Sequence, residues 1–286
     1  MPEVLTDYDE FLTRLQLLVS KHPALMINTL SNVFTMRLIG NKTHGDLAEV
    51  AIAEFINQFM YDYAAKHVGK DLFRAKTHEE DILITSLVHS CDIPVSLKAY
   101  GDGPLQLSTD KKGSLFLLLS SSNLKRISDP AVIQVILASD AFDEVRHLNV
   151  LPLIYREASM ECNIMVFEFG KAIRDIATIE LEGADSGRGR KHPVWRFLNV
   201  DGDYIAEVRY GGASANALQR GFWTHTRNAE TYFKSITDGW VSYAHNMVLV
   251  DLFAKALNST QAGHQAALDI IEQDLVSLKR DQGMPT

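Results

Sequence analysis

The 286-residue sequence contains only two cysteines, Cys91 and Cys162. Two cysteines cannot build a disulfide framework or a thiolate zinc site, so a reducing cytoplasm is the expected environment. No apolar run approaches the roughly 18 residues that a membrane span requires. The acidic N-terminus has neither the basic nor the apolar region of a secretory signal. These absences predict a cytoplasmic protein that makes no membrane contact.

Several enzyme motifs are also missing from the chain. The sequence has no Gly-x-Gly-x-x-Gly after a predicted strand, no P-loop and no Gly-x-Ser-x-Gly. The net charge of −8 argues weakly against a nucleic-acid partner, because phosphate contacts need clustered Lys and Arg. One stretch differs from the rest, since residues 186–234 carry more basic than acidic side chains. The composition therefore permits DNA binding without indicating it.

The hydrophobic pattern predicts one α/β domain over residues 1–286. Apolar spacing predicts helices over 7–39, interrupted near Pro23, and over 43–67. Strands are predicted at 81–87, 93–100 and 114–120, a hairpin at 195–212 with its turn at Asp201–Gly202, and helices over 129–180 and 216–257. This order predicts a mixed β-sheet flanked by helices, with additional helical segments.

Two charged residues occupy adjacent predicted strands. Asp81 opens the first strand and Lys98 lies within the second. Phosphodiester hydrolysis requires a divalent metal and an activated water, and Mg²⁺ prefers carboxylate oxygens while it keeps several waters. A lysine beside that metal can position the water or help to deprotonate it. The alternative is structural, with Asp81 in solvent and Lys98 extended along a sheet edge.

The segments "DILI" and "PVSLKAYG" resemble the PD-(D/E)XK nucleases, in particular the type II restriction endonucleases. In that family an Asp opens one strand, an acid-x-Lys lies on the next, and an upstream helix supplies a Glu. The resemblance implies a restriction-endonuclease-like core over about 43–120, with Lys98 as the catalytic lysine. It implies that Asp81 and Glu49 bind Mg²⁺.

The resemblance breaks at one position of the motif. Ser96 stands where the family has an acid, so the local motif is Ser-Leu-Lys. We place Ser96 or its carbonyl near the metal, and the missing acid raises the demand on Glu49. Glu54 competes with Glu49 for the helix position, and Glu79 and Glu80 are further candidates.

The resemblance also implies a substrate and an assembly. It implies sequence-specific, Mg²⁺-dependent cleavage of double-stranded DNA by a homodimer, because a palindromic site is matched by a two-fold protein. We predict DNA recognition within 186–257. The candidate contacts are Arg188, Arg190, Lys191, Arg209, Asn216, Gln219, Arg220 and His225, with Arg227 as a further candidate. The alternative for this stretch is a helix start packed on a sheet, with Gln and Asn in solvent.

Three other interpretations remain open. Glu207-Val-Arg209, preceded by Asp201 or Asp203, could itself be the nuclease motif, although Arg is a poor base. Glu144-x-x-His147 has the spacing found in di-iron carboxylate bundles, but a second Glu-x-x-His is missing. A non-catalytic DNA-binding protein would share the basic stretch and would need neither the acid nor the lysine of the predicted site.

Overall fold

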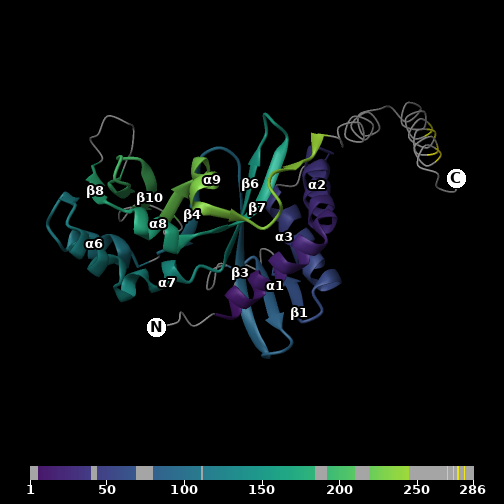
Figure 1. The fold of residues 1–286 in the computed structure, drawn as a ribbon, viewed down its shortest axis with the longest axis horizontal. Helices are drawn as coiled ribbons and strands as arrows, with labels where there is room; N and C mark the ends of the chain where they lie inside the picture. The colour runs from purple at the N-terminus through teal and green to yellow at the C-terminus, as the bar shows by residue number, and fades with distance from the viewer. Residues whose placement is uncertain are drawn as a thin grey trace.

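The computed structural model describes residues 6–39, 44–68, 80–110, 112–183, 192–209 and 219–244, together with positions 269, 273, 276 and 280. The chain forms two β-sheets, one of seven and one of six strands. In Figure 1 the three N-terminal helices lie beside the first sheet, and helices α6 and α7 lie with the second sheet at the other end of the molecule. The α/β class predicted from the sequence is confirmed.

The predicted N-terminal helices are present. They are α1 (Asp7–Lys21), α2 (Pro23–Ile39) and α3 (His44–Phe59). The hydroxyl of Thr6 accepts a hydrogen bond from the Asp9 amide, and the Asp9 carboxylate accepts one from the Thr6 amide, which closes a capping box at the start of α1. Pro23 begins α2, where a helix loses nothing by the missing N–H. The interruption seen near Pro23 is therefore a junction between two helices.

The first sheet has the strand order β1-β2-β3-β6-β7-β12, and β13 also pairs with β7. Its strands are β1 (Tyr63–His67), β2 (Ile82–Ser86), β3 (Cys91–Tyr100), β6 (Val150–Arg156), β7 (Glu161–Phe167), β12 (Phe233–Ser235) and β13 (Val241–Ser242). Strands β3 and β6 run parallel, and the other paired strands of this sheet run antiparallel. The predicted strands near 81–87 and 93–100 are thus the neighbours β2 and β3.

The second sheet is antiparallel and has the order β4-β11-β10-β9-β8-β5. Its strands are β4 (Pro104–Thr109), β5 (Arg126–Ile127), β8 (Thr178–Glu182), β9 (Val194–Leu198), β10 (Tyr204–Arg209) and β11 (Gly221–His225). The helical turns of this half are α5 (Ser114–Ser120), α6 (Pro130–Leu137), η1 (Asp140–Phe142), α7 (Asp143–Arg146), α8 (Phe169–Asp175), η3 (Thr226–Asn228) and α9 (Ala229–Tyr232). The predicted hairpin with its turn at Asp201–Gly202 is confirmed as β9 and β10.

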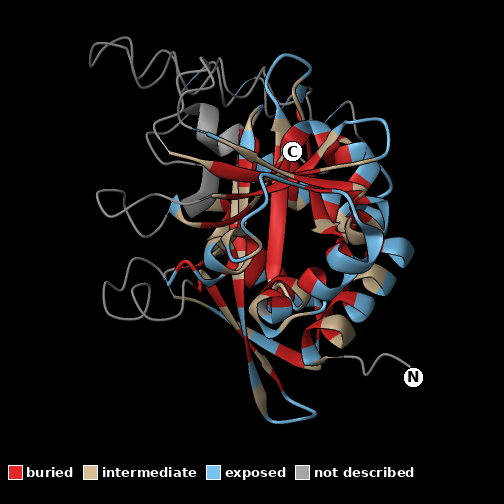
Figure 2. Cartoon of the chain, turned by 90° about the vertical axis from the view of Figure 1, so that its left-hand side faces the viewer, coloured by how far each residue is buried: buried red, intermediate tan, exposed pale blue. Residues whose placement is uncertain are grey.

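Each sheet has its own apolar core, and strand β6 contributes to both. Leu151 and Leu153 pack in the core beneath α1–α3, whereas Val150 and Ile154 belong to the core of the second sheet. Figure 2 shows the corresponding pattern, with buried residues along the strands and exposed residues on the outer sides of the helices. Strand β6 is therefore covered on both of its faces.

Four secondary-structure predictions were wrong. The helix predicted over 43–67 ends at Phe59, and Tyr63–His67 forms strand β1. Residues 114–120 form helix α5 instead of a strand. The predicted helical region 129–180 contains strands β6 and β7 and the start of β8, and the predicted helical region from 216 contains β11, β12 and β13 within its described part, 219–244. The described residues also show no helix that is long and apolar enough to cross a bilayer.

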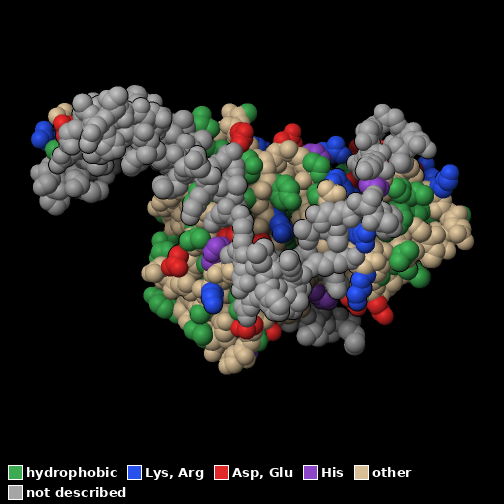
Figure 3. Space-filling view, turned by 180° about the vertical axis from the view of Figure 1, so that it is seen from behind, with side chains coloured by type: hydrophobic (Ala, Val, Ile, Leu, Met, Phe, Trp, Pro, Cys, Tyr) green, Lys and Arg blue, Asp and Glu red, His purple; other side chains and the backbone are tan. Residues whose placement is uncertain are grey.

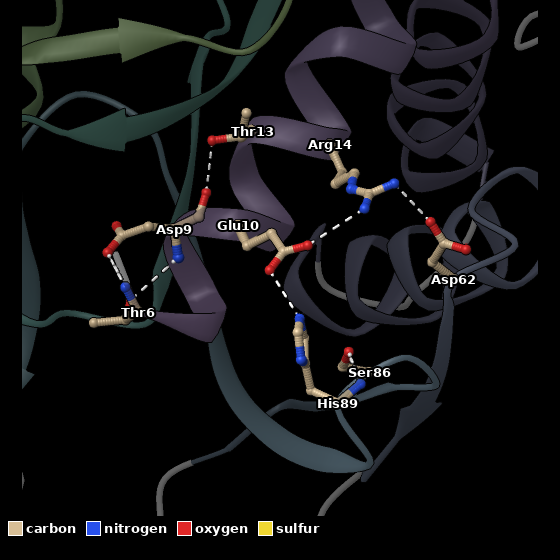
Figure 4. A network of polar contacts seen from close by, with 8 residues as sticks. All are labelled: Thr6, Asp9, Glu10, Thr13, Arg14, Asp62, Ser86 and His89. Carbon is tan, nitrogen blue, oxygen red and sulfur yellow. Dashed lines mark hydrogen bonds and ion pairs between the residues drawn. The ribbon is translucent and has the colours of Figure 1, made fainter. Parts of the chain in front are cut away.

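A polar network joins α1 to the turns beside the first sheet (Figure 4). Arg14 pairs with Glu10 at 3.4 Å and with Asp62 at 2.7 Å, while His89, in the β2–β3 turn, lies 3.0 Å from the other Glu10 oxygen. Exposed pairs of this kind stabilise a protein by only about 0–1 kcal/mol each. Their effect is to orient the β2–β3 hairpin against the helix layer.

Candidate functional site

Asp81 lies at the point where β1, β2 and β3 meet. Its N–H donates to the Val95 carbonyl and its carbonyl accepts from the Val68 N–H, both at 3.0 Å. Because Ile82 is paired with Val95, Asp81 stands opposite Ser96 at the start of the hairpin. The sequence pattern thus located the residue at the opening of the strand correctly.

The carboxylate of Asp81 is held by β3 through a single oxygen. Oδ2 accepts hydrogen bonds from the Ser96 hydroxyl at 2.7 Å and from the Leu97 N–H at 2.8 Å. The Lys98 Nζ lies 3.8 Å from the same oxygen, and the two charged side chains are 28% and 26% exposed. Strand β2 begins here, so the carboxylate takes the place that a main-chain carbonyl would otherwise occupy opposite Leu97. Asp81, Ser96 and Lys98 are called the Asp81 cluster below.

Glu49 does not join this cluster. Its Oε2 lies 2.9 Å from Nε2 of His67. His67 pairs across the sheet with Ile82, whose side chain is in the core beneath α1–α3. Side chains alternate along a strand, so Ser96 and Lys98 point to the opposite face from Val95 and Leu97, which are in that same core. The helix glutamate and the lysine therefore lie on different faces of the sheet.

The other acids considered from the sequence have different surroundings. Glu54 lies on an exposed side of α3. Glu80 is adjacent to Asp81 in the chain but is only 7% exposed. Glu79 lies outside the described residues.

The Asp81 cluster fits Mg²⁺ through one carboxylate only. In the described part of the chain, no group of three or more His, Cys, Asp or Glu side chains is placed to hold a metal ion. At this point the protein offers Asp81, whose interactions all use Oδ2. Mg²⁺ can be bound through one or two carboxylates when substrate phosphates and waters complete its shell. Asp81 thus fits as a ligand, and Glu49 does not fit as its partner in this structure.

The alternative centre at Glu207 is a closed charge cluster. Glu207 is 1% exposed, Arg209 Nε donates to its Oε1, and Arg196 Nε lies 3.8 Å from its Oε2. Arg196 Nε also lies 2.7 Å from Glu182 Oε2, a close ion pair whose angles fall outside those of a hydrogen bond. Guanidinium groups remain charged and cannot accept a proton from water. Neither arginine of this cluster can therefore act as the base that the lysine of the motif would supply.

Asp201 and Asp203 do not reach Glu207. Both residues are exposed in the β9–β10 turn, where their N–H groups donate to Asn199 Oδ1 at 3.0 and 2.7 Å. They shape the turn at the far end of the hairpin.

The Glu-x-x-His alternative is also not supported by the fold. Helix α7 ends at Arg146, and His147 is its C-cap with φ −116° and ψ 55°. The described chain contains two β-sheets, of seven and six strands, so it is not a helical bundle.

Part of the predicted DNA-contacting set lies along β10 and β11. Arg209 ends β10, its Cζ stands 4.0 Å from the ring centre of Trp223, and Arg220 immediately precedes β11. Gln219 is exposed. His225 accepts a hydrogen bond from the Arg227 N–H, and burial together with Arg227 lowers the pKa of this imidazole. Arg188, Arg190, Lys191 and Asn216 lie outside the described residues.

Sequence reasoning missed a row of side chains that crosses the second sheet. Glu180, Arg196, Glu207, Trp223 and Gln106 are successive cross-strand partners on β8, β9, β10, β11 and β4. They share one face of the sheet, while Trp195, Phe197 and Phe222 fill the core on the other. The alternation of polar and apolar residues within each strand signalled the face, but the order of the strands could not be read from it.

A hollow of about 880 Å³ lies beyond the ends of β3 and β6. Gly101, Asp102, Arg156, Glu157 and Arg227 are among its lining residues. Asp81, Ser96 and Lys98 do not line it. Figure 3 shows that Lys and Arg side chains on the visible part of one molecular face are dispersed among Asp and Glu. The partial exposure of Lys98 and Asp81 places the Asp81 cluster at the surface, outside this hollow.

Comparison with known proteins gave no relative. The chain matches no protein-family model, no curated protein and no solved structure. The function must therefore be inferred from the site itself.

Proposed function

We propose that this protein is a Mg²⁺-dependent endonuclease that hydrolyses phosphodiester bonds in double-stranded DNA. The observation that carries the proposal is the position of Lys98, whose amine lies 3.8 Å from the Asp81 carboxylate on the adjacent strand. Both groups remain partly exposed, as groups that meet a polymeric substrate must be.

The arrangement of the chain around the cluster supports a restriction-endonuclease-like core. Helix α3 precedes the antiparallel strands β1, β2 and β3, the acid opens β2, and the lysine lies on β3. This is the order of helix, acid-bearing strand and lysine-bearing strand that the sequence resemblance implied.

The proposed chemistry divides the work within the cluster. Ser96 and the Leu97 N–H fix Oδ2 of Asp81, which leaves Oδ1 as the oxygen available to the metal. When bound, Mg²⁺ would supply charge neutralisation at phosphorus and a water of lowered pKa. Lys98 would hold that water by a hydrogen bond for in-line attack, and its positive charge would stabilise the developing charge on the phosphate oxygens.

The proposal includes the assembly and the compartment. A homodimer would match the two-fold symmetry of a palindromic DNA site. A cytoplasmic location suits two free cysteines, Cys91 and Cys162.

The decisive experiment is cleavage by the purified protein of a randomised duplex library and of plasmid DNA, with Mg²⁺ and with EDTA. Wild-type protein should give discrete products with Mg²⁺ and none with EDTA. Lys98→Ala should reduce the rate by about 10²- to 10⁴-fold, the usual contribution of a positioned proton-transfer group. Asp81→Asn should impair cleavage and also weaken Mg²⁺ binding measured by calorimetry in the presence of DNA.

Two substitutions in the same β-sheet, one on β1 and one on β3, serve as matched controls. Lys66→Ala removes an exposed lysine of β1, and Asp92→Asn removes a carboxylate of β3 that accepts from the Thr85 hydroxyl at 2.8 Å. Both should cleave as the wild type does. Selective DNA binding without cleavage, unchanged by Lys98→Ala, would overturn the nuclease in favour of a pure DNA-binding protein. A wild-type protein that neither cuts nor binds DNA would overturn both.

A further inference from the structure

We infer that Arg209 reads a guanine in the DNA site, and that Glu207 and Trp223 hold its guanidinium in the reading position. The inference rests on the proposed function and names a specificity-determining residue for it. It assigns Arg209 to a base edge, whereas the sequence pattern indicated only a general DNA contact.

The contacts of Arg209 with the protein leave its two terminal guanidinium nitrogens available to a ligand. Its Nε donates to Glu207 Oε1, and its Cζ lies 4.0 Å from the Trp223 ring centre. One edge and one face of the guanidinium plane are therefore occupied by protein. The two terminal nitrogens make no hydrogen bond within the described chain, and the side chain is 25% exposed. A planar pair of N–H donors is the group that binds O6 and N7 of guanine together in the major groove.

The support beneath Arg209 is rigid. Glu207 lies on β10, which has β9 on one side and β11 on the other, and it is 1% exposed. A buried carboxylate is costly unless it is paired, and a buried ion pair adds little net stability compared with apolar residues. The Glu207 carboxylate instead fixes the plane of the Arg209 guanidinium. The ring of Trp223, which lies across from Glu207 on β11, does the same. A side chain ordered in advance loses less entropy when it binds.

Tyr100 of β3 connects Arg209 electrostatically with the strand that carries Lys98. Tyr100 follows Lys98 by two residues on β3, so it lies on the same face at about 7 Å along the strand. Burial raises the pKa of Tyr100, while a hydrogen bond with the Gln106 backbone and the charge of Arg209 lower it. The charge of Arg209 therefore acts on Tyr100, which stands two residues from Lys98 on β3.

The test uses 7-deazaguanine, which lacks the N7 acceptor, at each guanine of the site selected from the randomised library. For wild-type protein we expect one position at which this change weakens cleavage, and binding measured with Ca²⁺ in place of Mg²⁺, by about 5- to 10-fold, because one of the two hydrogen bonds of the bidentate contact is lost. Arg209→Ala should bind normal and modified duplexes equally at that position. Glu207→Gln should keep its fold, checked by circular dichroism, and show an intermediate preference there.

Arg227→Ala is the matched control, because Arg227 also stacks on an aromatic ring, Tyr204, at 5.0 Å. It should change the affinity for all sequences by the same factor. If wild-type protein selects and cleaves a site but Arg209→Ala keeps every guanine preference, the inference is wrong while the nuclease stands. If wild-type protein selects no site at all, the proposed function itself has failed.

Discussion

The side chain of Asp81 should stabilise β3 in addition to its proposed role at the metal, and the unfolding of Asp81→Ala measures this structural role. This substitution removes the acceptor of the Ser96 hydroxyl and the Leu97 N–H. Leu97 is 3% exposed, so its N–H would be left nearly buried without a partner, which costs about 1–3 kcal/mol. The lost bond from Ser96 adds about 1 kcal/mol, and the ion pair with Lys98 adds at most about 1 kcal/mol because both groups are exposed by more than a quarter.

The free energy of unfolding should therefore fall by about 2–5 kcal/mol, and the midpoint of thermal unfolding by roughly 4–10 °C. Circular dichroism during urea and heat denaturation measures both quantities. Lys98→Met should cost at most about 1 kcal/mol, and Asp92→Ala, at an exposed position on the same strand, about 0.5 kcal/mol. The reasoning is refuted if Asp81→Ala is no more destabilising than Asp92→Ala, because β3 would then not depend on this carboxylate.

Three further outcomes follow from single contacts. Gly221→Ala should lower the free energy of unfolding by about 3 kcal/mol or more. A Cβ at this position, where φ is +132°, would lie 2.0 Å from the Ser108 carbonyl oxygen. Gly103→Ala, at φ +144° with no atom within 4 Å of the added Cβ, should lower the free energy of unfolding clearly less in the same urea titration. Burial raises the pKa of Tyr8 above its ordinary 10.0, so the contribution of its neutral hydroxyl to stability is complete below pH 10 and is lost as the pH rises further. Above pH 10 the free energy of unfolding of the wild type should fall by about 1.4 kcal/mol per pH unit relative to Tyr8→Phe. Parallel plots of this free energy against pH for the two proteins would contradict the prediction. Glu49→Gln should keep the cleavage rate within about threefold of the wild type, because the Glu49 carboxylate lies on the helix-covered face of the sheet. A loss of about 10²-fold or more, the size expected for a lost catalytic group, would show that DNA binding brings Glu49 to Asp81.

The parts of the fold that were predicted correctly have a clear local period. Helices α1 and α2 repeat their apolar residues at helical spacing, and β9 and β10 flank a turn at Asp201–Gly202. Strands β2 and β3 alternate buried with partly exposed residues. These signals are local, so they require no knowledge of the sheets.

The wrong predictions involve segments without such a period. Strand β6, "VLPLIYR", is buried on both faces over its first residues and therefore shows no alternation. The segment "SLFLLLS" is apolar and short, and its helical form is decided by packing of Leu115 and Leu119 in the second core. Short apolar runs of this kind are ambiguous between helix and strand.

The candidate site was predictable only within one hairpin. Asp81, Ser96 and Lys98 meet because two adjacent strands pair directly, which the sequence spacing indicates. The face on which Glu49 lies depends on how α3 packs and on its pairing with His67, and neither is encoded in a local pattern. The partners of Arg209 come from strands that pair across the second sheet, so only the three-dimensional structure reveals them.

Strand β6 has a consequence for how this protein can be divided. Because alternate side chains of one strand fill the two cores, neither sheet can lose β6 without exposing a row of apolar groups to water. The halves that carry the Asp81 cluster and Arg209 should consequently melt in a single transition. Fragments cut between them would not be expected to fold as separate cutting and reading modules.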